Sequence, residues 1–438
     1  MRFLLLLTAS LLWPLAAAGA PQSLLDIYVL AVEEDPRVNI AELQLELSEA
    51  QRGAAGAALL PQANLTAQPT NNTIDFQREA DPHQEYDGER FGFQVRQVLF
   101  NWSAFAARAR TGQVVDQREN ELLDTLAQLS VDVSERYFNV LLADDNVRLL
   151  EAEQNLVEQQ FEETQARYER ELVPITELLE IQSRVDQVRT DLIEARNNAA
   201  IAREELTLLT GAPVTAVAPL REDAALPPLE QTLAWWLERA REQNAGLLAR
   251  RDAVQAARRG VEESRGQGIP DVSFVLSGQR ADVGFDNLQT PERDVVFLGV
   301  DVTVPLFAGG GNRARLREAW SQFYIAREEE EGTLGEVTRR VRGAWLNASA
   351  ARARVDAAAA TVESAATAYR AMRKAFTLGG VRAADVLEAL HRRTRAERDY
   401  QEARYGYLFH WISLQREAGE VDAGDMRLLN RQVIAASP

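Results

Sequence analysis

The 438-residue chain contains no cysteine, which excludes disulfide bonds, thiol catalysis, cysteine metal sites and a lipid attached to cysteine. After the first twenty residues, no stretch approaches the eighteen consecutive apolar residues that indicate a membrane-spanning helix. Basic residues number 48 against 66 acidic ones, for a formal net charge of −18. Without a large basic cluster to bind phosphates, we expect no nucleic-acid partner. Solvation of long helices explains the acidity, and the functional alternative is a water-filled lumen that favours cations.

Catalytic and metal-binding patterns are also missing. The glycines at 309–311 lack the Lys-Ser/Thr of a phosphate-binding loop and are read as a strand-to-helix turn. The three histidines, His83, His391 and His410, lie far apart without metal-ligand spacing. No nucleophile-and-base motif is present. We therefore predict no enzyme activity, no cofactor and no metal.

The first twenty residues have the pattern of a secretory signal peptide. Arg2 is the lone basic residue, an apolar stretch runs from Phe3 to Ala18, and Ala18-Gly19-Ala20 is a small-residue cleavage site. The alternative is a membrane anchor, but the apolar core is short for a spanning helix. We predict export, with residues 1–20 removed.

Two long segments of the chain contain no proline and could therefore form long helices. None occurs between Pro82 and Pro174, and none between Pro305 and Pro438. A helix from about Ser103 to Leu172 would have about 70 residues and span roughly 105 Å, more than a bilayer or an ordinary globular helix. The apolar residues of this helix form a stripe along one face, and charged and amide residues flank it. We therefore expect such helices to project into water as antiparallel coiled coils. We predict turns at about 171–174 and 378–381. The apolar stripe in the first of these helices is Leu122, Leu126, Leu129, Val133, Tyr137 and Val140.

The chain repeats itself at an offset of about 208 residues. Leu60-Pro61-Gln62 resembles Ile269-Pro270-Asp271, and Leu209-Thr210-Gly211 resembles Glu417-Ala418-Gly419. Glu34-Asp35-Pro36 likewise resembles Glu242-Gln243-Asn244. A near-constant offset over this length indicates an internal duplication. We predict a first repeat at 21–211, a Pro/Ala-rich linker at 212–228, a second repeat at 229–419 and a C-terminal tail at 420–438.

Each repeat also holds two runs of alternating polar and apolar residues, predicted as β-hairpins at about 59–100 and 269–307. Alternation over about ten residues is typical of transmembrane β-strands, although a half-buried soluble sheet gives the same pattern. The polar segments Thr70–Glu89 and Ala281–Arg293 are expected to be exposed loops. The predicted lipid-facing residues are Phe91, Phe93, Val95, Val272, Phe274, Leu276, Val296, Leu298, Val300, Val302 and Val304.

Four strands in a bilayer require more than one copy of the chain. Open sheet edges are not tolerated in hydrocarbon, and the smallest known barrels have about eight strands. Two copies would give eight strands with a filled interior, and three would give twelve and leave room for a pore. The residues alone do not choose between these two assemblies.

Specific stretches resemble the TolC-like family of outer-membrane efflux proteins (outer membrane factors). They are Val98–Trp102, Leu172–Glu177, Val304–Gly310, Arg382–Ala389 and Ala403–Leu408. The most specific pieces are Pro-Leu-Phe-x-Gly-Gly within Val304–Gly310 and Asp-Val-Leu-Glu-Ala within Arg382–Ala389. The resemblance implies a mainly α fold with a β-barrel portion, in which a homotrimer forms a 12-stranded barrel through the outer membrane and a helical tunnel through the periplasm. It also implies a periplasmic adaptor, an inner-membrane transporter, and passive outward conduction in tripartite efflux or type I secretion.

The resemblance further implies a narrow periplasmic entrance lined by carboxylates. Asp385 and Glu388 lie three residues apart after the second turn, so they share a helix face and threefold symmetry would make two acidic rings. Where this chain has Glu388, the family pattern has aspartate. The possible entrance partners are Glu177 and Glu180 in the first repeat and the basic residues Arg184 and Arg382, which we expect to pair with carboxylates and hold a closed state. The alternative for each is an exposed helix charge with little effect.

Two other classes of protein compete with a channel. A structural or adhesive periplasmic coiled coil would explain the long helices but not the four alternating strands. A secreted enzyme with helical repeats is disfavoured by the missing motifs. Trimers in mild detergent that conduct ions would distinguish a channel from both.

Overall fold

The helices of the two halves match in order and in length. The computed structural model describes residues 21–75, 83–221, 225–284, 288–420 and 430, so the predicted signal peptide and most of the predicted tail lie outside the described residues. Each half has helices of 11, 22, 67 and 36 residues. The internal two-fold repeat is therefore confirmed. In chain order the helices are α1 (Leu24–Glu34), α2 (Pro36–Ala57), α3 (Trp102–Tyr168), α4 (Ile175–Thr210), α5 (Leu233–Gln243), α6 (Ala245–Gly266), α7 (Gly311–Thr377) and α8 (Ala383–Ala418).

The two 67-residue helices, α3 and α7, have defined starts and stops. The Asn101 side chain accepts a hydrogen bond from the Ala104 N–H (2.9 Å) and so caps the start of α3. This helix ends at Tyr168, slightly earlier than the sequence suggested. In the turn that follows, Glu171 adopts a left-handed φ of 57°. In the second turn Gly379 takes that conformation, with φ of 77°, as the glycines there predict.

The chain divides into two compact units. Of the described residues, one unit holds those up to Ile40, those within Leu122–Ala245 and those from Leu334 onward, and the other holds those within Ala41–Glu121 and Gly246–Thr333. In the first unit Tyr137 and Tyr407 are fully buried within one apolar core. This core contains most of the predicted α3 stripe: Leu129, Val133, Tyr137 and Val140 are buried, and Leu122 and Leu126 pack against them.

The segment between the repeats is packed rather than loose. Val217 and Ala218 are buried in the same core, and Val217 forms a parallel bridge with Gln22. The Tyr137 hydroxyl donates to the Ala218 carbonyl (2.5 Å), and the Tyr407 hydroxyl donates to the Pro227 carbonyl. These bonds satisfy two buried hydroxyls and fix the segment in place.

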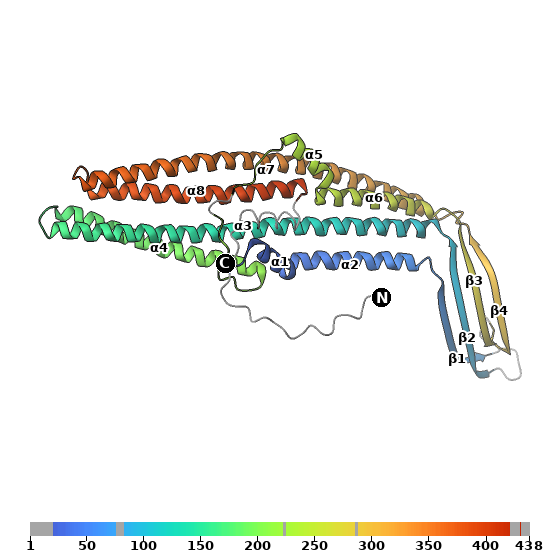
Figure 1. The fold of residues 1–438 in the computed structure, drawn as a ribbon. Coiled ribbons are helices and arrows are strands. Elements are labelled where there is room, and N and C mark those ends of the chain that lie inside the picture. Colours follow the sequence, from blue (N-terminus) through green and yellow to red (C-terminus); the bar gives the residue numbers. More distant parts are fainter. Residues whose placement is uncertain (1–20, 76–82, 222–224, 285–287, 421–429, 431–438) are drawn as a thin grey trace. The chain divides into compact units, whose positions relative to one another are not determined.

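At their turns, the two helical hairpins share a second core. Val157 of α3, Val185 of α4, Phe376 of α7 and Leu387 of α8 belong to one buried cluster. The Arg167 guanidinium lies 4.3 Å from the centroid of the Phe376 ring and covers the end of this cluster. The turn-proximal parts of α3, α4, α7 and α8 therefore form one packed bundle (Figure 1).

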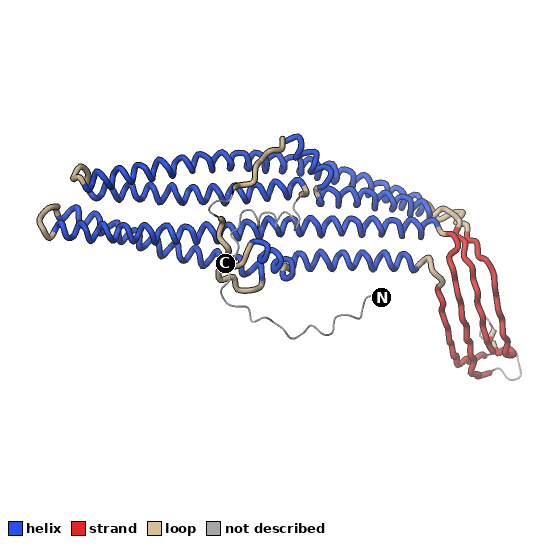
Figure 2. The backbone as a smooth tube through the Cα atoms, viewed as in Figure 1, coloured by secondary structure: helices blue, strands red, loops and turns tan. Residues whose placement is uncertain are grey.

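The strands belong to the second unit and form a single antiparallel sheet, red in Figure 2, in the order β1-β2-β3-β4 labelled in Figure 1. None of the helices in the described part of the chain contains an apolar segment of the length that a membrane span requires. The mainly helical fold with four strands is confirmed. The strands are β1 (Gln62–Asp75), β2 (His83–Phe100), β3 (Asp271–Val283) and β4 (Gln289–Thr303).

The predicted exposed loops were too long. Pairing continues into the polar segments, and β1 and β2 remain in register from Gln62↔Arg96 to Asp75↔His83. Polar side chains contribute to this pairing, since Thr70 Oγ donates to the Gly88 carbonyl (3.3 Å). At the other boundary β4 ends at Thr303, so Val304 lies outside the strand to which it was assigned. Pro305 follows and has no N–H to continue a ladder.

Candidate functional site

Asp385 stabilises the start of α8. Its carboxylate accepts a hydrogen bond from the Arg382 N–H (3.1 Å), as in a helix capping box, and lies 3.8 Å from the Arg382 guanidinium. The Asp385 and Arg382 side chains are 44% and 68% exposed. The carboxylate therefore faces solvent at the second turn and has a basic partner within its own helix end.

Glu177 connects the two hairpins. Its carboxylate accepts a hydrogen bond from the backbone N–H of Ala383 (3.2 Å), the first residue of α8. A side chain of the first repeat thus satisfies a free N–H at the helix start in the second repeat, where the helix dipole also favours a negative charge. The structure assigns Glu177 to the junction between the repeats.

A groove of about 300 Å³ lies between α4 and α8 and brings together three of the predicted site residues, Glu180, Arg184 and Glu388. Glu388 also pairs with Arg392 (3.1 Å) one helical turn further on. Asp385 and Arg382 do not line this groove. Its full lining is Glu180, Ser183, Arg184, Gln187, Ala384, Leu387, Glu388 and His391.

Arg184 has a partner that the sequence reasoning missed. It forms an ion pair with Glu153 of α3, whose side chain is 1% exposed. Its guanidinium also contacts Nδ1 of His391. Glu153 occupies a position where the buried stripe of α3 should be apolar, because Val157 and Thr164 follow it at helical spacing and are both buried. A carboxylate at such a position is rare without a partner. The position of Glu153 in the stripe was therefore the sequence feature that could have predicted a buried ion pair.

The sheet has one apolar face. The register pairs Val95 with Leu276 and Leu276 with Leu298, and paired residues lie on the same side of a sheet. The opposite face carries polar residues such as Asn64, Gln94 and Ser277. Val304 lies beyond β4, and contact of this face with lipid stays a prediction. The predicted residues that share the apolar face are Phe91, Phe93, Val95, Val272, Phe274, Leu276, Val296, Leu298, Val300 and Val302.

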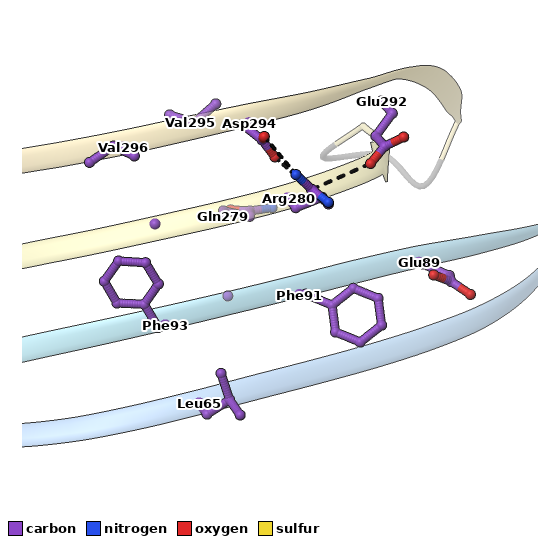
Figure 3. Close-up of a pocket in the computed structure, with 12 residues that line it drawn as sticks. Leu65, Glu89, Phe91, Phe93, Gln279, Arg280, Glu292, Asp294, Val295 and Val296 are labelled. Atoms are coloured by element: carbon purple, nitrogen blue, oxygen red, sulfur yellow. Dashed lines mark hydrogen bonds and ion pairs between the residues drawn. The ribbon is translucent and has the colours of Figure 1, made fainter.

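The apolar face ends in a charged border near the hairpin connections (Figure 3). Arg280 binds Asp294 through two hydrogen bonds of 2.8 and 2.9 Å, and Glu292 lies 3.4 Å from the same guanidinium. From Val272 to Arg280, β3 advances about 27 Å along the strand. At a strand tilt of 35–45° this corresponds to a height of roughly 20 Å, most of the ~25 Å apolar band of membrane barrels.

A shallow hollow of about 590 Å³ lies between the apolar face and this border, and the border residues Arg280, Glu292 and Asp294 line it together with Leu65, Phe91, Phe93 and Val296 (Figure 3). Gly278 supplies the space for one of the rings, because a Cβ there would lie 2.3 Å from Phe93 Cε1. The glycine is thus required by a close cross-strand contact. The ring covers the backbone of β3 and keeps this row of the face apolar.

Comparison with known proteins gives one consistent result. The family model described as outer membrane efflux protein matches the chain twice, at residues 27–212 and 236–420. Alkaline protease secretion protein AprF of Pseudomonas aeruginosa is 30% identical over 421 residues, covering 93% of this chain and 86% of that protein. Outer membrane protein TolC of Vibrio cholerae is 27% identical over 434 residues, covering 98% of each.

Solved structures support the fold. The chain matches CusC, described in terms of folding and transmembrane channel formation, with a TM-score of 0.77 at 16% identity, covering 91% of this chain and 92% of that one. It matches the outer membrane protein VceC of Vibrio cholerae with a TM-score of 0.75 at 18% identity, covering 90% and 96%. At these identities the likeness concerns the fold.

Proposed function

The chain belongs to the outer membrane efflux protein family, and from this premise we propose that three copies form a channel through the outer membrane that conducts substrates passively outward. The family's two matches cover both repeats. The relative whose name refers to alkaline protease secretion is 30% identical to this chain. This similarity favours type I secretion over tripartite efflux. Export would depend on a signal peptide at residues 1–20.

The observation that carries this proposal is the two-faced sheet with its unpaired edges. The apolar face suits lipid and the polar face suits a water-filled lumen. Within the described chain, β1 and β4 are the outer strands of the sheet and each lacks a partner on one side. Unpaired edges cannot remain in hydrocarbon, so β4 of one copy would pair with β1 of the next. Three copies give twelve strands and leave a pore.

The helical turns would form the periplasmic entrance, where the channel meets an adaptor and an inner-membrane transporter. Threefold symmetry would convert Asp385 and Glu388 into acidic rings that attract cations. Glu177 and Glu180 lie close to them, since one binds the first residue of α8 and the other shares a groove with Glu388. The possible latches, Arg382 and Arg184, already have acidic partners in Asp385 and Glu153.

A structural or adhesive coiled coil is the competing function. It would explain the helical hairpins but gives no role to an apolar sheet face. Purification in mild detergent distinguishes the two, because a channel should form stable trimers that conduct ions in a planar bilayer. A mature chain that is monomeric and dissolves freely without detergent would contradict the channel.

We expect the double variant Asp385→Ala/Glu388→Ala to raise single-channel conductance and to weaken block by divalent cations. The reason is that six carboxylates would leave the narrowest point of the trimer, where a ring of charge acts most strongly. The measurement is conductance in planar bilayers with increasing magnesium on the periplasmic side. Glu328→Ala/Glu331→Ala removes the same charge at the same spacing from α7. An equal change in this control would assign the effect to total charge and reject the acidic rings.

A further inference from the structure

An arginine-rich pocket of about 430 Å³ lies on the helical side of the second unit. Arg52 of α2, Arg108 of α3 and Arg259 of α6 line it, although the chain as a whole is acidic. The one acidic residue in the lining is Asp116, which accepts a hydrogen bond from Gln113 Nε2 (2.9 Å). Three positive charges against one negative charge favour an anion. The full lining is Arg52, Phe105, Arg108, Ala109, Gly112, Gln113, Asp116 and Arg259.

Two of these guanidinium groups are available to a ligand. Within the described part of the chain, the side chains of Arg52 and Arg108 form no hydrogen bond or ion pair, whereas Arg259 pairs with Glu262 (2.7 Å). Arg108 reaches across to α2, since a Cβ added at Gly56 would lie 3.9 Å from its Nε. A guanidinium only donates hydrogen bonds, and its planar fork matches two oxygens of a phosphate group. The pocket therefore has unused donors of the kind that phosphate requires.

The three arginines lie at a similar height below the sheet. Arg108 follows the first residue of α3, Trp102, by six positions. Arg52 and Arg259 precede the last residues of α2 and α6 by five and seven positions. At 1.5 Å per residue these offsets correspond to about 8–10 Å from the helix ends that lead to the strands. Phospholipid headgroups occupy about 5–8 Å on each side of the hydrocarbon, and an arginine stem spans the remaining distance.

Phe105 connects the pocket to the apolar face of the sheet. Its ring lies 6.5 Å from that of Phe100, and Phe100 pairs with Val272 on the apolar face after a β-bulge in β2. Phe100, Trp102 and Phe105 are 40%, 44% and 45% exposed. Exposed aromatic residues are favoured where a membrane meets water. One lipid could therefore place its acyl chains on the apolar face and its phosphate in the pocket.

We propose that Arg52, Arg108 and Arg259 bind the phosphate group of an anionic phospholipid, such as phosphatidylglycerol, in the periplasmic leaflet of the outer membrane. This inference rests on the proposed function, because it requires the sheet to span that membrane. One site in each copy gives three in a trimer. The bound lipids fix the height of the channel in the bilayer, a task that no cysteine-linked lipid can perform in this chain.

Native mass spectrometry of the purified trimer tests the site, with phosphatidylglycerol or zwitterionic phosphatidylcholine added in mild detergent. We expect up to three phosphatidylglycerol molecules to bind, with an affinity roughly tenfold or more above that for phosphatidylcholine. Arg52→Glu/Arg108→Glu should abolish this preference, because two anions replace two cations. The matched control is Arg313→Glu/Arg317→Glu, which should keep it. Arg317 follows the start of α7 by six positions, as Arg108 follows the start of α3, and neither control residue lines the pocket.

Three other results would overturn the lipid site. An equal loss of preference in the control would assign the effect to a generally basic surface at this height. Displacement of phosphatidylglycerol by millimolar inorganic phosphate would make the pocket a site for free phosphate. Dissociation of the trimer in the Arg52→Glu/Arg108→Glu variant alone would place the pocket at a contact between copies.

The same measurements separate the lipid site from the channel function. A conducting trimer that binds the two lipids equally would reject the lipid site and keep the channel. A protein that does not conduct ions, but prefers phosphatidylglycerol and loses this preference in Arg52→Glu/Arg108→Glu, would retain the lipid site and reject the channel.

Discussion

Replacing Gly419 by alanine should lower the free energy of unfolding of the first unit by about 3 kcal/mol, more than either of the two other glycine substitutions below. Gly419 ends α8 in the left-handed region, with φ of 79°, where a Cβ is strained. A Cβ would also lie 2.3 Å from the Gln243 carbonyl oxygen and 2.7 Å from the Asn244 nitrogen. These are backbone atoms at the α5–α6 junction, so they cannot rotate away as a side-chain end would. Thermal unfolding followed by circular dichroism, and the yield of folded trimer, measure the loss.

Two other glycines separate the causes of this effect. Gly309 has φ of 59°, and no atom lies within 4 Å of the position that a Cβ would take, so Gly309→Ala should cost only the backbone strain, about 1–2 kcal/mol. Gly343 lies within α7 in open space, so Gly343→Ala should be neutral or stabilise by up to about 1 kcal/mol. If Gly419→Ala loses no more stability than Gly309→Ala, the backbone at the α5–α6 junction must move to accommodate the added Cβ. The close approach would then not be rigid.

Gly419 also shows what the duplication could and could not reveal. Short matches in the sequence linked Gly211 with Gly419, and Glu34-Asp35-Pro36 with Glu242-Gln243-Asn244. In the structure each glycine lies against the other matched segment of its own half, and a Cβ added at Gly211 would lie 3.3 Å from the Glu34 side chain. The offset predicted that both sites exist twice. It contained no information on distance, so the contact between them was not predictable.

Periodicity predicted the elements better than composition predicted their ends. Helical spacing identified the buried stripe of α3, and alternation placed ten of the selected residues on one face of the sheet. Polar composition then suggested loops at 70–89, whereas backbone pairing continues to Asp75 and resumes at His83. A strand ladder satisfies backbone groups whatever the side chains are, so polarity alone does not end a strand.

At the entrance, the sequence indicated residue types but not pairings. Asp385 and Glu388 were chosen for their spacing after the second turn, and their local partners Arg382 and Arg392 follow helical geometry. The link from Glu177 to Ala383 and that from Arg184 to Glu153 join residues far apart in the chain. Such pairings depend on how the hairpins pack, and a single sequence does not specify that.

Val95→Arg is expected to prevent stable insertion in the outer membrane, whereas Gln94→Arg in the adjacent position should be tolerated. Val95 pairs with Leu276, which pairs with Leu298, in the middle of the apolar face. An arginine facing lipid at the bilayer midplane costs about 2–4 kcal/mol, and a trimer would contain three of them. Gln94 pairs with Asn64 and Ser277 on the polar face, where a charge would meet water in the lumen.

The comparison of these two variants isolates the direction in which the side chain points, because both introduce the same residue at neighbouring positions of β2. The measurement is the amount of trimer in purified outer membranes, which should fall more than tenfold for Val95→Arg and stay within about twofold of wild type for Gln94→Arg. Equal loss in both variants would mean that β2 tolerates no arginine on either side, as in a sheet buried between protein layers. Equal survival would place the apolar face in water or against a protein partner, and the channel proposal would lose its main support.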